Sequence, residues 1–540
     1  MLVRNLHGRL TYVVAALCLL LAMPLAASAQ QSTPKTTIGW VPREILERPV
    51  TLRQGIGVVH QKVTTSSAEA QPFYDQGLAY LNSYVWIEAA RSFNQALRLD
   101  PSLAMAYLGL SDAYIGLQDL AEAGAAFEKA QSLAEKVSDR ERAWLKIRSL
   151  YFNYLADSGD MQKYFAYRQA ISDALAVDST DPFLWVLRGF ADEGTPIAHG
   201  QNGGVDTIAF YQTALSLAPN SFVGHHYLAH TLENLGPSEQ AIEQAAAYAR
   251  LAPAVPHAHH MYGHELRRAG RTEEAIAEFR KADELENAYY RAENIPAKYD
   301  WHHAHNLLLL ALCYQTLGEM KLAEATYREA FALPSYSDLA DYNRKAWPEF
   351  LLNRGRAKEA LDAAQSLIQS QWTLAQFAGH ALAGRALLAL GRPADATGEL
   401  NLSQEKIQQF PKGAGDRFPD ATALQAEILL QTKKWDEGNA LMNHVEQQLV
   451  ALPGPDSWSA TMFQLENIAA LARKLEDWEL ADSSAQKMME HDPSYAGSHY
   501  ALGFVAEHNG ESAAARQQFT TADKLWSKAD PGVPPQLKQH

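Results

Sequence analysis

Cysteine is nearly absent from this sequence. Cys18 and Cys313 are the two cysteines in 540 residues, so no framework of disulfide bonds can hold the fold. Complete enzyme motifs are also missing, because we find no G-x-S-x-G nucleophile elbow and no phosphate-binding loop ending in GK[ST]. The stretch HHMYGH spaces two histidines as the H-E-x-x-H helix of metalloproteases does, but it carries Met261 where the glutamate is needed. The sequence therefore favours a binding protein over an enzyme.

Basic residues are in deficit, with 47 lysines and arginines against 62 aspartates and glutamates and a net charge of −15. Nucleic acids and anionic membrane surfaces select basic patches, so this balance argues against both as partners. Apolar runs long enough to span a membrane are absent beyond residue 30. The composition is otherwise that of a globular protein held together by packing.

The first 29 residues have the features of a secretory signal peptide. Arg4 and Arg9 precede an apolar run over residues 10–25, and Ala27 and Ala29 flank Ser28 in a cleavage site of small residues. We therefore expect cleavage after Ala29 and an exported mature protein, periplasmic or secreted, with no membrane anchor after cleavage. The net charge then becomes −17 because two arginines are lost.

A repeat with a period of 34 residues runs through most of the remaining chain. Several copies have aromatic and small residues in the first half, followed by the pattern A-x-x-x-F-x-x-A in the second half. The pattern occurs, for example, at Ala89, Phe93 and Ala96, at Ala123, Phe127 and Ala130, and at Ala515, Phe519 and Ala522. It resembles the tetratricopeptide repeat, in which pairs of helices stack into a right-handed solenoid.

The resemblance implies an all-α fold, a tetratricopeptide-repeat right-handed superhelical solenoid of about 11–12 helix pairs. Clear copies start near residues 70, 104, 222, 256, 304, 377, 419, 462 and 496, and degenerate copies start near 148 and 341. The expected order is a signal peptide (1–29), an N-terminal arm (30–67), a first repeat array (68–286) with a glycine-rich insertion (192–205), an insertion rich in aromatic residues and histidine (287–303), a second repeat array (304–527) and a disordered tail (528–540). It further implies that the concave surface binds a protein or an extended peptide.

Three histidine-rich segments, HHYLAH, APAVPHAHHMYGHELRR and YDWHHAHN, further resemble a group of exported bacterial repeat proteins with no established activity. This second resemblance supports the fold and the export, and it implies no reaction.

Histidines gather in the two copies that start at Phe222 and Pro256. On a helix, positions 4, 8 and 11 of a copy form the packing stripe, and positions 2, 5, 9 and 12 form a second stripe about 115° away. In this repeat family the second stripe lines the concave groove, so we expect six histidines to face one cavity: His226, His230, His257, His260, His264 and His305. His225 and His259 fall at position 4, where we expect them to pack between helices.

Two H-x-x-x-H pairs on neighbouring helices give a geometry that metals use. We predict His226, His230, His260 and His264 as ligands, with His257, His302 and His305 as additional candidates, for zinc, copper or nickel. On the same helices, the side chains expected to contact a partner are those of Glu233, Arg267 and Arg268. Three interpretations stay open. The cluster binds a metal, as a metal-binding protein or metal-dependent enzyme would; it forms part of a peptide-binding surface; or duplication of the repeat has multiplied structural histidines.

Overall fold

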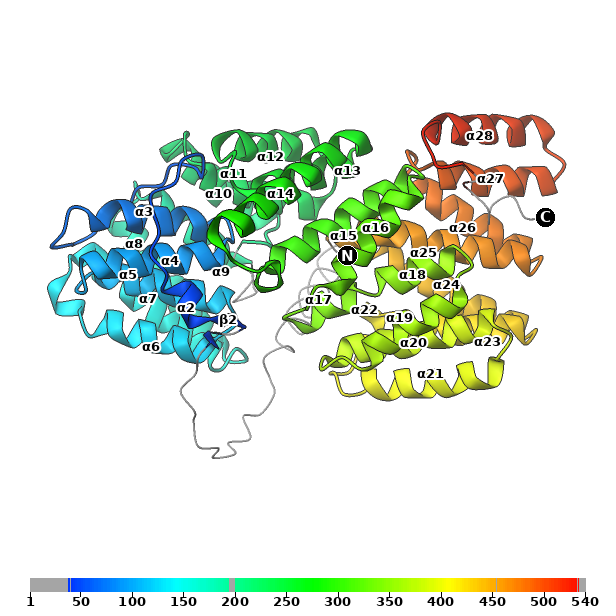
Figure 1. Cartoon of the computed structure of the whole chain (residues 1–540), viewed down its shortest axis with the longest axis horizontal. Helices are drawn as coiled ribbons and strands as arrows, with labels where there is room; N and C mark the ends of the chain where they lie inside the picture. Colours follow the sequence, from blue (N-terminus) through cyan, green and yellow to red (C-terminus); the bar gives the residue numbers. More distant parts are fainter. Residues whose placement is uncertain (1–36, 39, 194–199, 453, 532, 534–540) are drawn as a thin grey trace, which may run out of the picture. The chain divides into compact units, whose positions relative to one another are not determined.

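The computed structural model describes residues 37, 38, 40–193, 200–452, 454–531 and 533, and these residues fold into successive helices joined by short turns (Figure 1). The predicted signal peptide and residues 194–199 of the glycine-rich insertion lie outside the described residues. In the described part of the chain, the sheet consists of two short antiparallel strands, β1 (Thr37–Ile38) and β2 (Val41–Pro42). The expected all-α class is therefore confirmed. No helix in the described ranges has the length and apolar character that crossing a membrane requires.

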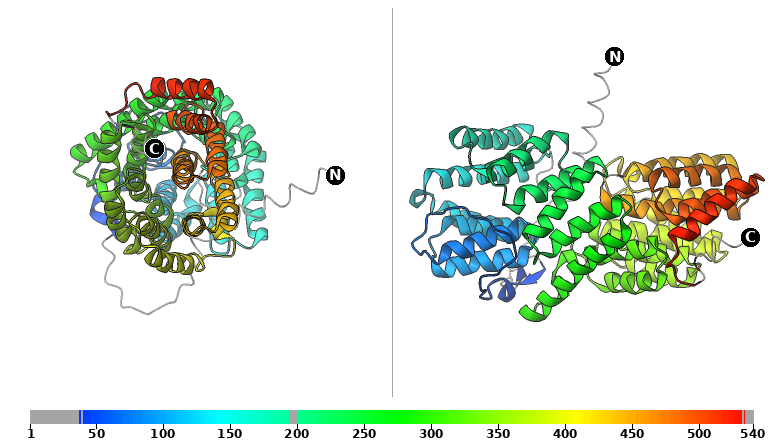
Figure 2. Two further views of the ribbon diagram at one scale, coloured as in Figure 1. Left: turned by 90° about the vertical axis from the view of Figure 1, so that its right-hand side faces the viewer. Right: turned by 90° about the horizontal axis from the view of Figure 1, so that it is seen from above.

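The chain divides into two compact units, each built from consecutive helices (Figures 1 and 2). The first unit comprises residues 1–265 and 281–300, and the second comprises residues 266–280 and 301–540. The helices that lie wholly in the first unit are α2 (Arg43–Leu46), α3 (Ala70–Leu81), α4 (Trp86–Leu99), α5 (Ala104–Gly116), α6 (Leu120–Gln131), α7 (Asp139–Leu155), α8 (Met161–Val177), α9 (Pro182–Asp192), α10 (Val205–Leu217), α11 (Phe222–Leu235) and α12 (Glu239–Leu251).

Helices α13 (Pro256–Arg268) and α14 (Thr272–Glu293) contribute residues to both units. The helices that lie wholly in the second unit are α15 (Trp301–Thr316), α16 (Met320–Ala332), α17 (Asp338–Asn343), α18 (Ala346–Asn353), α19 (Ala357–Ile368), α20 (Thr373–Ala389), α21 (Pro393–Ile407), α22 (Ala414–Arg417), α23 (Asp420–Gln431), α24 (Trp435–Val450), α25 (Pro455–Lys474), α26 (Trp478–His491), α27 (Ala496–His508) and α28 (Ser512–Leu525). The predicted starts at 70, 104, 222, 256 and 496 coincide with the first residues of α3, α5, α11, α13 and α27.

Small residues in the first helix of a repeat allow the second helix to approach closely. A Cβ atom added at Gly77 in α3 would lie 2.5 Å from the ring of Phe93 in α4. The same contact recurs in the last repeat, where a Cβ at Gly503 would lie 2.5 Å from the ring of Phe519. The small residue and the phenylalanine of the sequence pattern are therefore two halves of one packing contact.

Three boundaries differ from the expected ones. The predicted insertion at 287–303 is largely helical, because α14 continues to Glu293 and a short 3₁₀ turn, Ala297–Tyr299, leads into α15. The degenerate copy near 148 is a regular helix pair that begins at α7, where Ser138 and Glu141 form a capping box. The predicted disordered tail is ordered at its beginning, because the N–H of Asp530 donates to the carbonyl of Gly318 (3.0 Å).

Candidate metal centre

Histidines at position 4 of the repeat hold two helices together, as the pattern predicts. The Nδ1 atom of His225 lies 2.7 Å from Oε1 of Gln244 in α12. Two more histidines at this position make the same contact with the residue 19 positions later, since His380 contacts Glu399 and His499 contacts Gln518, each at 2.7 Å. Nε2 of His259 lies 3.1 Å from the carbonyl oxygen of Pro253. His225, His380 and His499 thus bind within their own repeat, and His259 binds the turn just before its helix. His225 and His259 are therefore matched controls for the cluster below.

Three other histidines bring their Nε2 atoms together in the interior of the first unit. Nε2 of His226 lies 3.1 Å from Nε2 of His230, one turn further along α11, and 3.0 Å from Nε2 of His257 in α13. All three side chains are buried, and one ligand atom from each lies within 4.8 Å of those of the other two. We call His226, His230 and His257 the histidine triad.

Hydrogen bonds fix the orientation of two rings of the triad. Nδ1–H of His226 donates to the backbone carbonyl of Asn82 (2.7 Å), which places the lone pair of the neutral ring on Nε2. Burial, together with the neighbouring His230, lowers the pKa of His226 well below its usual value, so this ring stays neutral. Nδ1 of His230 faces a carboxylate oxygen of Glu233 at 3.5 Å. Carbonyl and carboxylate partners of this kind orient histidine ligands in metal sites.

Aromatic rings surround the triad. The ring of Tyr84, in the turn between α3 and α4, lies 4.8 Å from that of His226 and 4.9 Å from that of His257 between centroids. Tyr227 and Tyr248 pack against His226 at 4.6 and 4.7 Å. These tyrosines are buried, so they separate the triad from solvent.

The remaining two predicted ligands in α13 form a separate pair. Nε2 of His260 lies 2.8 Å from Nε2 of His264, and Nδ1 of His264 lies 2.8 Å from a carboxylate oxygen of Glu233. Burial alone would raise the pKa of Glu233, but the charge of His264 and hydrogen bonds from His264 and His230 lower it to about 2. The expected set of four ligands is therefore divided. His226 and His230 meet His257, which was predicted as an additional candidate, whereas His260 and His264 lie outside the triad.

The other predicted site residues have different surroundings. Arg267 is buried in the second unit, where it pairs with Asp492 (2.9 Å) and lies over the ring of Trp458. Glu233 is also buried, so neither it nor Arg267 is exposed to a partner, whereas Arg268 is half-buried over Trp458. His302 and His305 belong to the second unit, in which Nδ1 of His305 lies 3.6 Å from Asp456.

Two residues of the first repeat, Asn82 and Tyr84, complete the surroundings of the triad. Helical periodicity does not identify them, because they lie in a turn. Tyr84 and Asn82 are more than 140 residues away from His226, and they meet it through a turn. Tyr84 has a positive φ of 58°, at a turn position where other repeats use glycines such as Gly270, Gly318 and Gly391. A tyrosine at a turn position where other repeats have glycine is the one feature of the sequence that could have indicated the role of this turn.

Comparisons with known proteins identify the repeats. The sequence matches the tetratricopeptide repeat over residues 74–137, 256–289 and 304–335. No curated protein matches the sequence.

Similar solved structures include yeast Tom70 (13% identity, TM-score 0.40, covering 75% of this chain and 92% of that chain) and a human IFIT1 dimer with PPP-AAAA (14%, 0.38, 86% and 96%). The APC/C hetero-tetramer Cut9–Hcn1 is also similar (12%, 0.29, 87% and 96%). The helices that carry the triad's third ligand and the first repeats thus belong to segments with the tetratricopeptide pattern.

Proposed function

We propose that this chain, an all-helical tetratricopeptide-repeat solenoid, is an exported scaffold protein that binds one transition-metal ion through His226, His230 and His257. The observation that carries the proposal is the convergence of three buried Nε2 atoms, with separations of 3.0 and 3.1 Å from His226. In a tetrahedral zinc site with Zn–N distances of about 2.0–2.1 Å, two nitrogen ligands are about 3.3 Å apart. The two separations from His226 lie within about 0.3 Å of that value, and all three ligand atoms lie within 4.8 Å of one another.

Hydrogen bonding among the rings accounts less well for the arrangement. Nε2 of the neutral His226 ring has a single lone pair in the ring plane, because its Nδ1–H is donated to Asn82. Two imidazole nitrogens approach that one lone pair, from His230 and from His257. A cation accepts lone pairs from all three rings at once, whereas a single acceptor serves one N–H donor well.

The donor set restricts the chemistry of the ion. Three imidazoles suit zinc, copper or nickel, and a tetrahedral ion held by three protein ligands retains one position for water or another ligand. In this proposal Asn82 and Glu233 orient His226 and His230, as partners outside the coordination sphere commonly do. His264 instead contacts Glu233 and His260, each at 2.8 Å, and in this proposal it does not bind the ion.

The scaffold part of the proposal follows from the repeats. Tetratricopeptide repeats present a series of helix faces, and such arrays serve protein–protein interactions. The signal-peptide features of the first 29 residues support the export part of the proposal. A metal ion that joins α11 to α13 would stabilise the first unit as a rigid platform for a partner.

Calorimetric titration of the metal-stripped, tag-free protein at pH 7.5 tests the proposal. Zinc, copper and nickel are titrated separately, and we expect at least one to bind with one ion per chain. His226→Ala and His257→Ala should each weaken binding by more than about 100-fold, because each removes a ligand. His225→Ala is the matched control, since its ring binds Gln244 and not the triad. Absence of binding heat for all three metals, or equal loss in the control, would refute the site.

A further inference from the structure

The N-terminal arm lies on the first unit as an extended segment that side chains hold by its backbone. From Val59 to Val63, alternate residues are buried (Val59, Gln61 and Val63), while His60 and Lys62 between them are exposed. This alternation is that of a β-strand, yet neither edge of the segment pairs with another strand in the described part of the chain. Its backbone hydrogen bonds are made mainly by side chains of helices.

Two glutamines of α3 bind the arm in the same way. The amide of Gln76 donates to the carbonyl of Thr51 (3.2 Å) and accepts from the N–H of Arg53 (2.7 Å). The amide of Gln71 donates to the carbonyl of Gln61 (3.0 Å) and accepts from the N–H of Val63 (3.1 Å). Each amide therefore binds the carbonyl of one residue and the N–H of the second residue after it.

Contacts from other helices extend this backbone recognition. Asn94 of α4 donates to the carbonyl of Leu46 (2.9 Å), and Glu141 of α7 accepts from the N–H of Thr64 (2.8 Å). Leu46 ends helix α2, so the Asn94 contact fixes the start of the extended segment. Backbone groups are common to every sequence, so the glutamine and Glu141 contacts select an extended conformation and not particular side chains.

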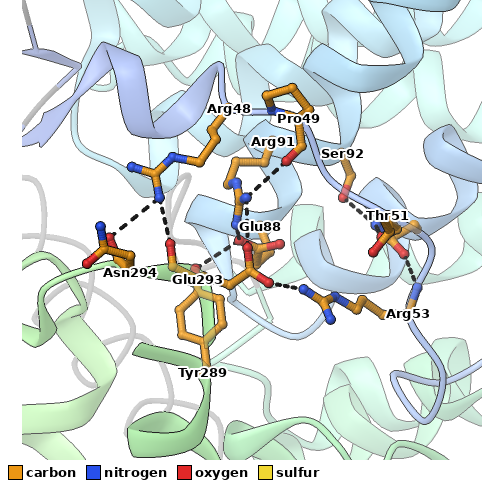
Figure 3. Close-up of polar contacts among 11 residues, drawn as sticks. Arg48, Pro49, Thr51, Arg53, Glu88, Arg91, Ser92, Tyr289, Glu293 and Asn294 are labelled. Carbon is orange, nitrogen blue, oxygen red and sulfur yellow. Dashed lines mark hydrogen bonds and ion pairs between the residues drawn. The ribbon is translucent and has the colours of Figure 1, made fainter. Parts of the chain in front are cut away.

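Charge supplies the side-chain selectivity (Figure 3). Arg53 of the arm pairs with Glu293 at the end of α14, and Arg48 donates to the backbone carbonyl of Glu293 (2.6 Å). Beneath them, the fully buried Arg91 joins Glu88 to Glu293. The last carbonyls of a helix carry partial negative charge, so this end of α14 favours cations. Two arginines five residues apart fit this surface.

A cavity lies next to the exposed residue Val58 of the arm, and the arm does not fill it. A cavity of about 230 Å³ is lined by Val58 and Val59 of the arm and by apolar residues that include Phe183, Val186 and Val223. Val58 itself is 77% exposed, so the arm does not use its full apolar content on this surface. A larger apolar side chain at this point would bury more area.

We infer that the surface holding the arm is a binding site for an extended basic peptide of a partner protein, and that the arm occupies this site in cis. The preferred peptide has two arginines five residues apart and an apolar residue six positions after the second arginine, as Arg48, Arg53 and Val59 are arranged. The tethered arm competes at high effective concentration, so a partner gains access when the arm is displaced. This inference extends the scaffold role and does not depend on the metal.

A cleavable full-length chain tests the inference. A specific protease site is inserted between Ala68 and Glu69, both exposed residues just before α3. The probe is a fluorescein-labelled synthetic peptide of residues 45–66. Its binding is measured by fluorescence anisotropy, with a chelator present to exclude effects of metal. We expect the peptide to bind the cut chain and to be excluded from the uncut chain. A peptide with unrelated side chains that keeps the two arginines and the apolar residue should bind as well.

Matched variants separate peptide recognition from general adhesion. Replacing Gln71 and Gln76 together by alanine should weaken peptide binding about 10- to 100-fold, because four hydrogen bonds to the backbone are lost. A probe carrying Arg48→Glu and Arg53→Glu should lose binding to a similar or greater extent. Gln95→Ala, in the same helix pair but bonded to Arg98, serves as the control that leaves peptide binding unchanged.

A second variant, which is not cut, controls for the possibility that cleavage unfolds the protein. The uncut protein with Arg48→Ala and Arg53→Ala keeps its arm tethered but weakly held, and we expect the wild-type peptide to bind it. If both this variant and the cut chain retain their helical circular dichroism and neither binds the peptide, the arm is a fixed part of the fold and the inference is wrong. Formation of a dimer with exchanged arms, seen by light scattering, would make a second copy the occupant and also contradict the inference.

Discussion

The polar cluster beside α11 in the first unit consists of imidazole and phenol rings, whereas the polar cluster beside α20 and α23 in the second unit consists of ion pairs. Lys345 lies 2.7 Å from Asp420, and Arg385 lies 2.7 Å from Glu427, with all four side chains largely buried. Opposite charges satisfy each other and leave little for a ligand. Converging imidazole nitrogens such as those of the triad can be satisfied by a cation. In our proposal, therefore, the same repeat provides a binding site in one unit and internal cohesion in the other.

The largest expected effect is the loss of an ion pair in the second unit. Lys345→Met leaves the buried Asp420 with Tyr342 as its remaining partner. Removing one member of a buried ion pair costs about 3–5 kcal/mol. Urea denaturation followed by circular dichroism should show this loss, and the double variant with Asp420→Leu should recover most of it. If the single variant loses less than about 1 kcal/mol, the ion pair is not the source of cohesion we describe.

Buried carboxyl groups with raised pKa values allow a comparison of the two units by pH. Burial raises the pKa of Glu193 in the first unit to about 8 and that of Glu466 in the second unit to about 7, although hydrogen bonds from Tyr211 and Tyr495 act in the opposite direction. Because the folded pKa exceeds the unfolded value of 4.5, the stabilising contribution is complete below pH 4.5 and is lost as the pH rises through the folded pKa.

We therefore expect Glu193→Gln and Glu466→Gln each to increase stability at pH 8 by about 2–4 kcal/mol. At about pH 3 the same variants should match the wild-type protein, since this pH lies well below the unfolded pKa of 4.5 and the carboxyl is protonated in both states. Denaturation curves at the two pH values give the comparison. A benefit of equal size at both pH values would mean that packing, and not protonation, is responsible.

Replacing the positive-φ residue in the turn between the two helices of a repeat by glycine should change stability in opposite directions in the two units. Tyr84, Lys433 and Glu476 all have positive φ values, between 58° and 63°. Tyr84→Gly removes backbone strain but also removes a buried ring that packs on the triad, so we expect a net loss of about 1–3 kcal/mol. Thermal unfolding measures the loss, and an increase in stability would show that the ring contributes nothing to the cluster.

The smallest effect is expected at the corresponding turns of the second unit. Lys433 and Glu476 are exposed, so replacing either by glycine should stabilise the protein by about 0.5–1 kcal/mol through relief of the left-handed conformation. Paired thermal melts of Lys433→Gly and Glu476→Gly check this value. A loss of stability in both variants would indicate that entropy of the unfolded chain dominates at these turns.

Period and residue size explain what could be predicted from the sequence. The 34-residue period located the starts of α3, α5, α11, α13 and α27, because the small residues and phenylalanines it contains are packing contacts. The role of His225 as a structural residue also followed from its position in the repeat.

Long-range contacts explain what could not be predicted. Helical periodicity placed His257 and His260 on one stripe, but ring orientation decides that His257 joins His226 while His260 joins His264. The contribution of Tyr84 depends on a turn in another repeat, and the docking of the arm depends on side-chain amides that have no local signature. Neither feature has a periodic pattern along the chain.

X-ray absorption spectroscopy of the protein loaded with one equivalent of zinc tests directly whether the triad binds the ion. We expect three imidazole nitrogens at about 2.0–2.1 Å from the ion, falling to two in His257→Ala, with no change in His259→Ala. His259 contacts the carbonyl of Pro253 and lies outside the triad, which makes it the appropriate comparison. A spectrum with no imidazole scattering, or one that is unchanged in His257→Ala, would contradict the account.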